Sequence, residues 1–256
     1  MTSDDVGLAA KLDQASSIDE RLDLVCRPLD DFGFSAFIYD YSPVPVSHDG
    51  RIIPPTFMTC RNVPSDFNTV WMSRGYIEID PVQTLMTQSL TPFVWSLRDG
   101  GNAVIRPVLR PDHRPAVGYL VDNRMTCGIT VPIHLPDGTV ASFTAIRIDP
   151  ERDFETGASL HLAEIALLGS LFNKAIYATL DGRQRTCQHV RLTRRERECL
   201  QWCARGLTAK EIAYRLDRSV GTVTMHINNA THKLRAKSRP QAVARAAYYR
   251  LLDGAC

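Results

Sequence analysis

LTRRERECLQWCARGLTAKEIAYRLDRSVGTVTMHINNATHKLRAKSRPQAVARAAYYRLL, residues 192–252, contains the recognisable starts of three short helices. Thr193–Glu196, Thr208–Glu211 and Ser238–Gln241 each have the Ser/Thr-x-x-Glu/Gln spacing of a capping box. In that box the hydroxyl accepts the N–H three residues on, and the acid or amide reaches back to the first N–H. A fourth helix is predicted over residues 219–234, where apolar side chains recur on one face: Val223, Ile227, Ala230 and Leu234. The stretch therefore predicts an all-α domain of four helices.

The second and third of these helices have the arrangement of a helix-turn-helix. Thr208–Leu216 is followed by a short turn at Asp217-Arg218 and then by the helix that begins at Ser219. From Arg191 to the end the chain has fourteen Lys/Arg and five Asp/Glu, a net charge of +9, whereas residues 1–190 carry −7. A basic helical end on an acidic front half is typical of a nucleic-acid-binding protein. The alternative is a solvated basic face without a partner.

Composition limits the other classes of function. A chain of 256 residues is long enough for two domains. Its first residues lack the basic and apolar segments of a signal peptide, and no apolar run approaches the roughly 18 residues of a membrane span. The seven Cys form no Cys-x-x-Cys pair and the seven His no ligand cluster, so we expect a cytoplasmic protein without metal or cofactor. Cys199 and Cys203 are expected to pack in a helical core.

The first 178 residues show a mixture of helical and strand patterns. They predict an α+β fold, an α-β-α sandwich with an antiparallel sheet, as residues 1–178, followed by a linker at 179–191 and the helical domain at 192–256. Pro28 is expected to end or kink the first helix. The predicted helices cover residues 5–32, 66–74, a segment from Asp80-Pro81, and 160–177. The predicted strands cover residues 34–41, 56–61, 92–95, 127–133 and 139–148, with a loop at 100–115.

Three C-terminal motifs are similar to the LuxR-type helix-turn-helix domain. They are Leu192–Leu200, Gly206–Ala213 and Ser219–His226, which include the Glu196, Leu200 and Gly206 typical of that family. The resemblance implies double-stranded DNA as partner, with base contacts from Thr224, Met225 and Asn228, which the helical wheel places away from the apolar stripe. Asn suits adenine, and Thr or Met suits a thymine methyl. Residues 241–251 resemble the family's dimerisation helix, so a homodimer on an inverted-repeat operator is expected. Phosphate contacts are expected from Lys210, Thr222, His226, Lys233 and Arg239.

The front half lacks the acidic pair of a phosphoacceptor receiver domain. It resembles instead the acyl-homoserine-lactone-binding domain of quorum-sensing LuxR-type receptors. The resemblance is carried by Asp80-Pro81-Val82, Trp95-Ser96, Gly128–Pro132 and Thr144. It implies that Asp80 accepts the ligand's amide N–H, that Trp95 walls the ligand pocket near Gly128, and that Thr144 lies near the acyl chain. Asp80 is also well placed to cap the helix that starts at Pro81, and both roles are compatible.

Three positions depart from that family. Phe67 stands where the family has its lactone-binding Trp, Trp71 where it has a Tyr, and Val63 where it has a second carbonyl-binding Tyr. The loss of these donors disfavours a homoserine lactone. A Trp at position 71 resembles orphan receptors (LuxR solos) of plant-associated bacteria, which respond to plant-derived compounds. The alternative for Phe67 and Trp71 is that both are core aromatics without a ligand contact. The segment from Ser96 to Met125 is longer than the family norm, which implies a different pocket lid.

The leading hypothesis is a transcriptional regulator that responds to a small signal molecule, either an acyl-homoserine lactone or a different, plant-derived compound. The alternative is a ligand-independent regulator that acts through mixed dimers and whose pocket is packed shut. We expect no enzyme, because the sequence has no nucleophile elbow, phosphate-cradling loop or acid–base pair.

Overall fold

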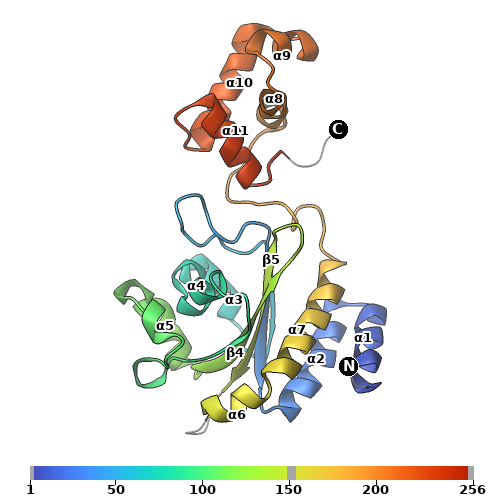
Figure 1. The fold of residues 1–256 in the computed structure, drawn as a ribbon, viewed down its shortest axis with the longest axis vertical. Coiled ribbons are helices and arrows are strands. Elements are labelled where there is room, and N and C mark those ends of the chain that lie inside the picture. Colours follow the sequence, from blue (N-terminus) through green and yellow to red (C-terminus); the bar gives the residue numbers. More distant parts are fainter. Residues whose placement is uncertain (1–2, 149–153, 253–256) are drawn as a thin grey trace. The chain divides into compact units, whose positions relative to one another are not determined.

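The computed structural model describes residues 3–148 and 154–252 (Figure 1). The described chain divides into two compact units. One contains residues 3–45, 52–148 and 154–181, and the other contains residues 46–51 and 182–252. The division after residue 181 falls within the predicted linker, and residues 178–193 contain no helix or strand. The two units are described separately below.

The first unit is built on an antiparallel sheet with the strand order β2-β1-β5-β4-β3. The central strands β1, β5 and β4 pair along seven or eight residues, so that Asp40 lies opposite Ser142 and Thr130 opposite Thr144. All five strands were predicted from the sequence. Their bounds are β1 Ala36–Ser42, β2 Phe57–Arg61, β3 Phe93–Ser96, β4 Cys127–His134 and β5 Val140–Arg147.

One face of the sheet is covered by α1 (Ser3–Gln14), α2 (Ile18–Asp31), α6 (Phe154–Leu160) and α7 (Leu162–Tyr177) (Figure 1). Side chains alternate along a strand, so Phe37 and Tyr39 of β1 and Phe143 of β5 all point to this face. The Phe37 and Phe143 rings stack at 5.3 Å, with Phe172 of α7 edge-on to both. The Tyr39 hydroxyl donates to Asn173 at 2.8 Å and holds α7 on the sheet. This aromatic layer is the main core.

The opposite face is covered by α3 (Phe67–Ser73), α4 (Pro81–Met86) and α5 (Arg114–Asp122) (Figure 1). A second apolar cluster joins these helices to Ala36, Trp95 and Ile146 of the sheet. Helices on both faces make the unit the predicted α-β-α sandwich. Four polar side chains of the strands are also buried on this face: Asp40, Thr130, Ser142 and Thr144.

Four expectations for helices in this unit were wrong in detail. Residues 5–32 form two helices rather than one, because Ser17 accepts the N–H of Glu20 and caps a new helix. Pro28 lies inside α2, which continues to Asp31. The segment after the predicted loop at 100–115 contains α5, where Ala116 and Leu120 are buried on one face. The predicted helix over 160–177 begins at Leu162 and follows the separate helix α6.

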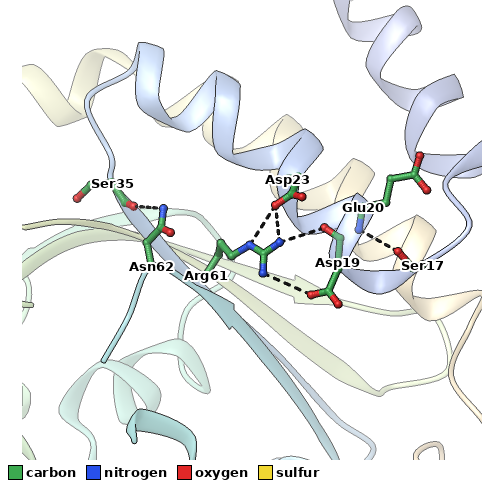
Figure 2. A network of polar contacts seen from close by, with 7 residues as sticks. All are labelled: Ser17, Asp19, Glu20, Asp23, Ser35, Arg61 and Asn62. Carbon is green, nitrogen blue, oxygen red and sulfur yellow. Dashed lines mark hydrogen bonds and ion pairs between the residues drawn. The ribbon is translucent and has the colours of Figure 1, made fainter. Parts of the chain in front are cut away.

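A charged network fastens the edge strand β2 to α2 (Figure 2). The Arg61 guanidinium at the end of β2 lies 3.4 Å from Asp19 and makes a shorter ion pair with Asp23, both on α2. The next residue, Asn62, has a left-handed backbone with φ of 58° and donates to the Ser35 carbonyl at 2.9 Å. These contacts fix the exit of β2, which leads directly to α3.

The second unit contains the four predicted helices: α8 Arg194–Ala204, α9 Ala209–Leu216, α10 Val220–Lys233 and α11 Arg239–Tyr248. Capping boxes at the starts of α8 and α9 have both reciprocal hydrogen bonds. At α11 the Ser238 hydroxyl accepts from Gln241, but the Gln241 carbonyl accepts the N–H of Lys237 rather than that of Ser238. Cys199 and Cys203 are buried in the core, as expected. Residues 253–256 of this predicted domain lie outside the described residues.

Short turns with left-handed residues connect these helices. Gly206 has φ of 85°, and its N–H donates to Cys203 while the N–H of Leu207 donates to Trp202, a Schellman end for α8. Asp217 has φ of 50° at the end of α9 and makes the turn of the helix-turn-helix. Within residues 3–148 and 154–252, no helix is long and apolar enough to cross a membrane.

Gly206→Ala should destabilise the second unit by about 1 kcal/mol. A Cβ at this position would meet no heavy atom within 4 Å, so the cost comes from the left-handed backbone alone. Hydrogen exchange of α8 and α9 in the full chain measures the effect. Gly221→Ala is the matched control, because Gly221 lies within α10 with ordinary helical φ; it should leave protection unchanged or raise it. Equal protection in both variants would contradict the assignment.

Candidate functional site

A cavity lies between the second face of the sheet and the helices α3, α4 and α5. Its volume is about 30 Å³, so the side chains around it are close to contact. The sheet contributes Ile38, Trp95 and Thr144, and the helices contribute Phe67 and Asp80. Five of the seven predicted ligand-binding residues line this cavity: Phe67, Trp71, Asp80, Trp95 and Thr144. Val63 and Gly128 do not line it. The cavity is also lined by residues that were not among the predicted ligand-binding residues: Ile38, Met58, Ile77, Val82, Gln83, Leu120 and Ile146.

Asp80 both caps a helix and lines the cavity. Its carboxylate accepts the N–H of Val82 at 2.8 Å at the start of α4, and its side chain is buried. Burial raises the pKa of Asp80 to about 7; N–H groups of Val82 and Gln83 oppose this rise, and the nearby charge of Asp40 adds to it. A carboxylate in this environment favours a partner that donates a hydrogen bond or carries positive charge.

Trp95 is fixed on the sheet by Gly128 and two threonines. A Cβ at Gly128 would lie 2.7 Å from the Trp95 ring and 2.5 Å from the Ala145 carbonyl oxygen, so only glycine leaves room for the indole. The Trp95 N–H donates to Thr130 at 3.0 Å, and the Thr130 and Thr144 hydroxyls are 3.0 Å apart. Gly128 therefore acts by positioning the Trp95 wall, and Thr144 ends a polar chain at the cavity.

The helical side of the cavity is an aromatic cluster. Phe67 and Trp71 are buried and stack at 5.0 Å between ring centres. Tyr119 of α5 packs on both rings, and its hydroxyl donates to Asp66 at 3.2 Å, which docks α5 on α3. Val63 is half-buried and packs on the edge of this cluster. Among residues 3–148 and 154–252, no group accepts a hydrogen bond from the Trp71 indole N–H.

Asp40 is the polar residue that sequence reasoning missed. It lies on the cavity face of β1, where it accepts from Ser142 across the sheet and from Gln83 of α4 at 2.7 Å. Burial raises the pKa of Asp40 to about 6, and the hydrogen bonds from Ser142 and Gln83 oppose the rise. An acid at an inward position of an otherwise apolar strand was the available signal.

The exposed face of α10 has the predicted base-reading side chains. Thr224, Met225 and Asn228 are exposed, and the Met225 side chain is 49% exposed despite its apolar character. Val223 and Ile227 of the same helix are buried against α8 and α9. The helical wheel was therefore correct about which side of α10 is covered.

The predicted phosphate contacts have different surroundings. Lys210 is exposed, His226 is half-buried, and the Thr222 hydroxyl lies 2.9 Å from that of Ser219. Lys233 pairs at 2.7 Å with Glu196, and Arg239 donates to the Leu207 carbonyl. Both cations thus have a partner inside the domain, which the sequence did not predict. Burial alone would raise the pKa of Glu196, but hydrogen bonds from Lys233 and from the Thr193 N–H outweigh it and lower that pKa.

An α-β-α sandwich followed in the chain by a basic helix-turn-helix domain is the architecture of a transcription factor. The family of autoinducer binding domains matches residues 17–176, and that of bacterial regulatory proteins of the luxR family matches residues 190–246. The chain belongs to the LuxR family of ligand-binding transcriptional regulators, which are transcription factors rather than enzymes.

Several known proteins are similar over most of this chain. The quorum sensing-dependent transcriptional regulator RpaR of Rhodopseudomonas palustris is 31% identical to this chain. The match covers 84% of this chain and 81% of RpaR. The transcriptional activator BjaR1 of Bradyrhizobium diazoefficiens is 27% identical, with 87% and 85% covered. The crystal structure of Escherichia coli SdiA has the same fold, with a TM-score of 0.57 at 19% identity over 98% of this chain and 99% of that one. SdiA has also been solved in complex with octanoyl-rac-glycerol.

Lys233→Met should destabilise the second unit by roughly 1–3 kcal/mol, because it removes the charged partner of the buried Glu196 carboxylate. The Glu196 pKa is lowered in the folded chain, so its contribution is present above the unfolded pKa of about 4.5 and is lost as pH falls through the folded value. In the variant the Glu196 pKa should rise toward or above its unfolded value, so the loss of stability on acidification should be smaller than in the unsubstituted chain. Thermal unfolding between pH 4 and 7 measures this.

Lys210→Met provides the control for this prediction, because Lys210 is exposed at the start of α9. It should leave the pH dependence of unfolding unchanged. The same acid sensitivity in the Lys233 and Lys210 variants would show that the ion pair with Glu196 does not stabilise the domain.

Proposed function

We propose that this chain is a cytoplasmic homodimeric regulator that reads an inverted-repeat operator with α10. The observation that carries the proposal is the exposed set Thr224, Met225 and Asn228 on a helix whose other side is buried. An exposed Asn can bond adenine bidentately, and an exposed Met beside a Thr can pack on a thymine methyl. The +9 charge from Arg191 onward supplies the attraction to phosphates that non-specific DNA binding needs.

Substitution of both Thr224 and Asn228 by Ala should reduce the preference for the selected operator by roughly 10-fold or more, since each good base contact discriminates by about 1–3 kcal/mol. Binding to a random duplex should change little, because the phosphate contacts remain. Fluorescence anisotropy at fixed salt with both duplexes measures the ratio. Asn229→Ala, exposed on the same helix, is the control and should keep most of the preference. An unchanged ratio in the double variant would refute the assignment of α10.

For the N-terminal pocket we propose a ligand other than an acyl-homoserine lactone, as for a solo receptor of plant-derived compounds. Phe67 has no N–H, and Val63 has no hydroxyl, so neither can donate to a lactone or acyl carbonyl. The Trp71 indole N–H is one turn further along α3, displaced by about 6 Å along the helix axis. This N–H remains available to a hydrogen-bond acceptor on a ligand of different shape. The Asp80 carboxylate can accept from a donor of the same ligand, and Thr144 lines the same cavity.

A panel of acyl-homoserine lactones should stabilise the chain weakly, and Phe67→Trp should strengthen the response by roughly 10-fold in affinity, because it restores an N–H donor. Thermal shift and calorimetric titration of the full chain give the two affinities. Phe57→Trp, on the other face of the sheet, is the control for an added indole. Nanomolar lactone binding by the unsubstituted chain would refute the proposal.

A second candidate function, regulation without ligand through mixed dimers, is favoured by one observation. The cavity of about 30 Å³ has room for about a single water, and the stacked Phe67 and Trp71 rings form one of its sides. Phe67→Ala separates the candidates, because a larger cavity should admit ligands that the packed one excludes. If neither the unsubstituted chain nor this variant responds to any small molecule while operator binding persists, the ligand-independent function is supported.

A further inference from the structure

The orientation of the Gln83 amide is set by a buried acid. Gln83 lies on α4, lines the cavity, and donates from Nε2 to Asp40 Oδ2 at 2.7 Å. Asp40 lies opposite Ser142 on the neighbouring strand, and the Ser142 hydroxyl donates to the same carboxylate oxygen. Because an ionised carboxylate only accepts hydrogen bonds, the NH₂ group of Gln83 has to face Asp40. The amide carbonyl is then the free end of the side chain.

The ionisation of Asp40 supports this orientation. Burial raises the pKa of Asp40 to about 6, with the hydrogen bonds from Ser142 and Gln83 opposing the rise. The group is therefore mainly a carboxylate at pH 7. Within residues 3–148 and 154–252, the Oε1 atom of Gln83 accepts no hydrogen bond. Because Gln83 lines the cavity, this carbonyl oxygen can accept a hydrogen bond from a donor on a ligand.

Gln83 and Asp80 present acceptors to the same cavity. Asp80 is the cap of α4, and Gln83 follows three residues later, so both side chains come from the first turn of one helix. On the opposite side, the buried Trp71 indole offers an N–H without a partner among the described residues. The polar groups around the cavity therefore fit a ligand that has two hydrogen-bond donors at one end and a hydrogen-bond acceptor that faces α3.

We propose that Asp40 is a positioning residue for ligand selection: it turns the Gln83 carbonyl to the cavity, so that Gln83 and Asp80 together select a ligand whose polar end carries two hydrogen-bond donors. This inference rests on the proposed function, in which the cavity binds a small molecule. It adds to that function a class of ligand, such as a diol or a hydroxy-amide, and explains why an acyl lactone with a single N–H is a poor match.

Two probes of nearly equal size test the selection. The first is 1-octanoylglycerol, which has two hydroxyl donors, and the second is 2,3-dimethoxypropyl octanoate, in which methyl groups replace both hydroxyl protons. Calorimetric titration of the full chain at pH 7 gives the affinity ratio. The unsubstituted chain should prefer the diol by about tenfold or more, since the diether leaves two acceptors unpaired.

Asp40→Asn should bring that ratio close to one. The Asn amide can donate to the Gln83 carbonyl, so the Gln83 amide is no longer held in one orientation. Asp13→Asn is the matched control, an exposed acid on α1 paired with Lys174, and should keep the preference for the diol. Gln83→Met is a second variant that should also remove the preference, and it keeps the test decisive if the Asp40 variant fails to fold.

A direct readout of positioning is the side-chain NH₂ of Gln83 in ¹⁵N-labelled protein. Its protons should exchange slowly with water in the unsubstituted chain and in the Asp13 variant, and rapidly in Asp40→Asn. Equal binding of diol and diether by the unsubstituted chain would overturn the inference and leave the proposed ligand binding intact. Binding of neither probe, by a chain that another small molecule stabilises, would overturn the inference alone. A chain that responds to no small molecule would overturn both the inference and the proposed ligand binding.

Discussion

Two buried carboxylates, Asp40 on the sheet and Asp80 at the start of α4, determine which groups can surround them. Asp40 and Asp80 both have a raised pKa because burial penalises their charge, and the charge of Asp40 contributes to the shift at Asp80. Each is hydrogen-bonded to neutral groups only: Ser142 and Gln83 for Asp40, and the α4 backbone for Asp80. Carboxylates buried in a low-dielectric interior are stabilised by further hydrogen bonds, and a ligand that carries a hydrogen-bond donor can supply one.

Apolar packing in the rest of the N-terminal unit offsets the free-energy cost of burying these two carboxylates. The opposite face of the same sheet is an apolar and aromatic layer in which Phe37, Phe143 and Phe172 are fully buried. Strand alternation separates the two tasks, because successive residues point to opposite faces. Phe37 and Tyr39 serve the core, while Ile38 and Asp40 face the cavity side. The C-terminal unit has an apolar core of its own, and capping boxes at α8 and α9 and the ion pair of the buried Glu196 with Lys233 add to its stability.

Much of the fold could be predicted from local patterns. Capping boxes at Thr193 and Thr208 and the stripe of Val223 and Ile227 predicted the C-terminal helices, because these signals lie within one or two turns. The partners of Asp40 and Lys233 could not be predicted, since Ser142 and Glu196 are distant in sequence and meet only in the folded chain. Helix α5 was missed because its Pro and Gly residues hid the spacing of Ala116 and Leu120.

The central claim is that the N-terminal cavity holds a small molecule through buried acceptors. Native mass spectrometry of the full chain purified from its own host tests it most directly, with fragmentation to identify any bound molecule. The account predicts one small molecule per chain, with hydroxyl or N–H donors and without a homoserine lactone ring. A chain that carries no molecule, and whose operator affinity is unchanged by extracts of its surroundings, would contradict the account.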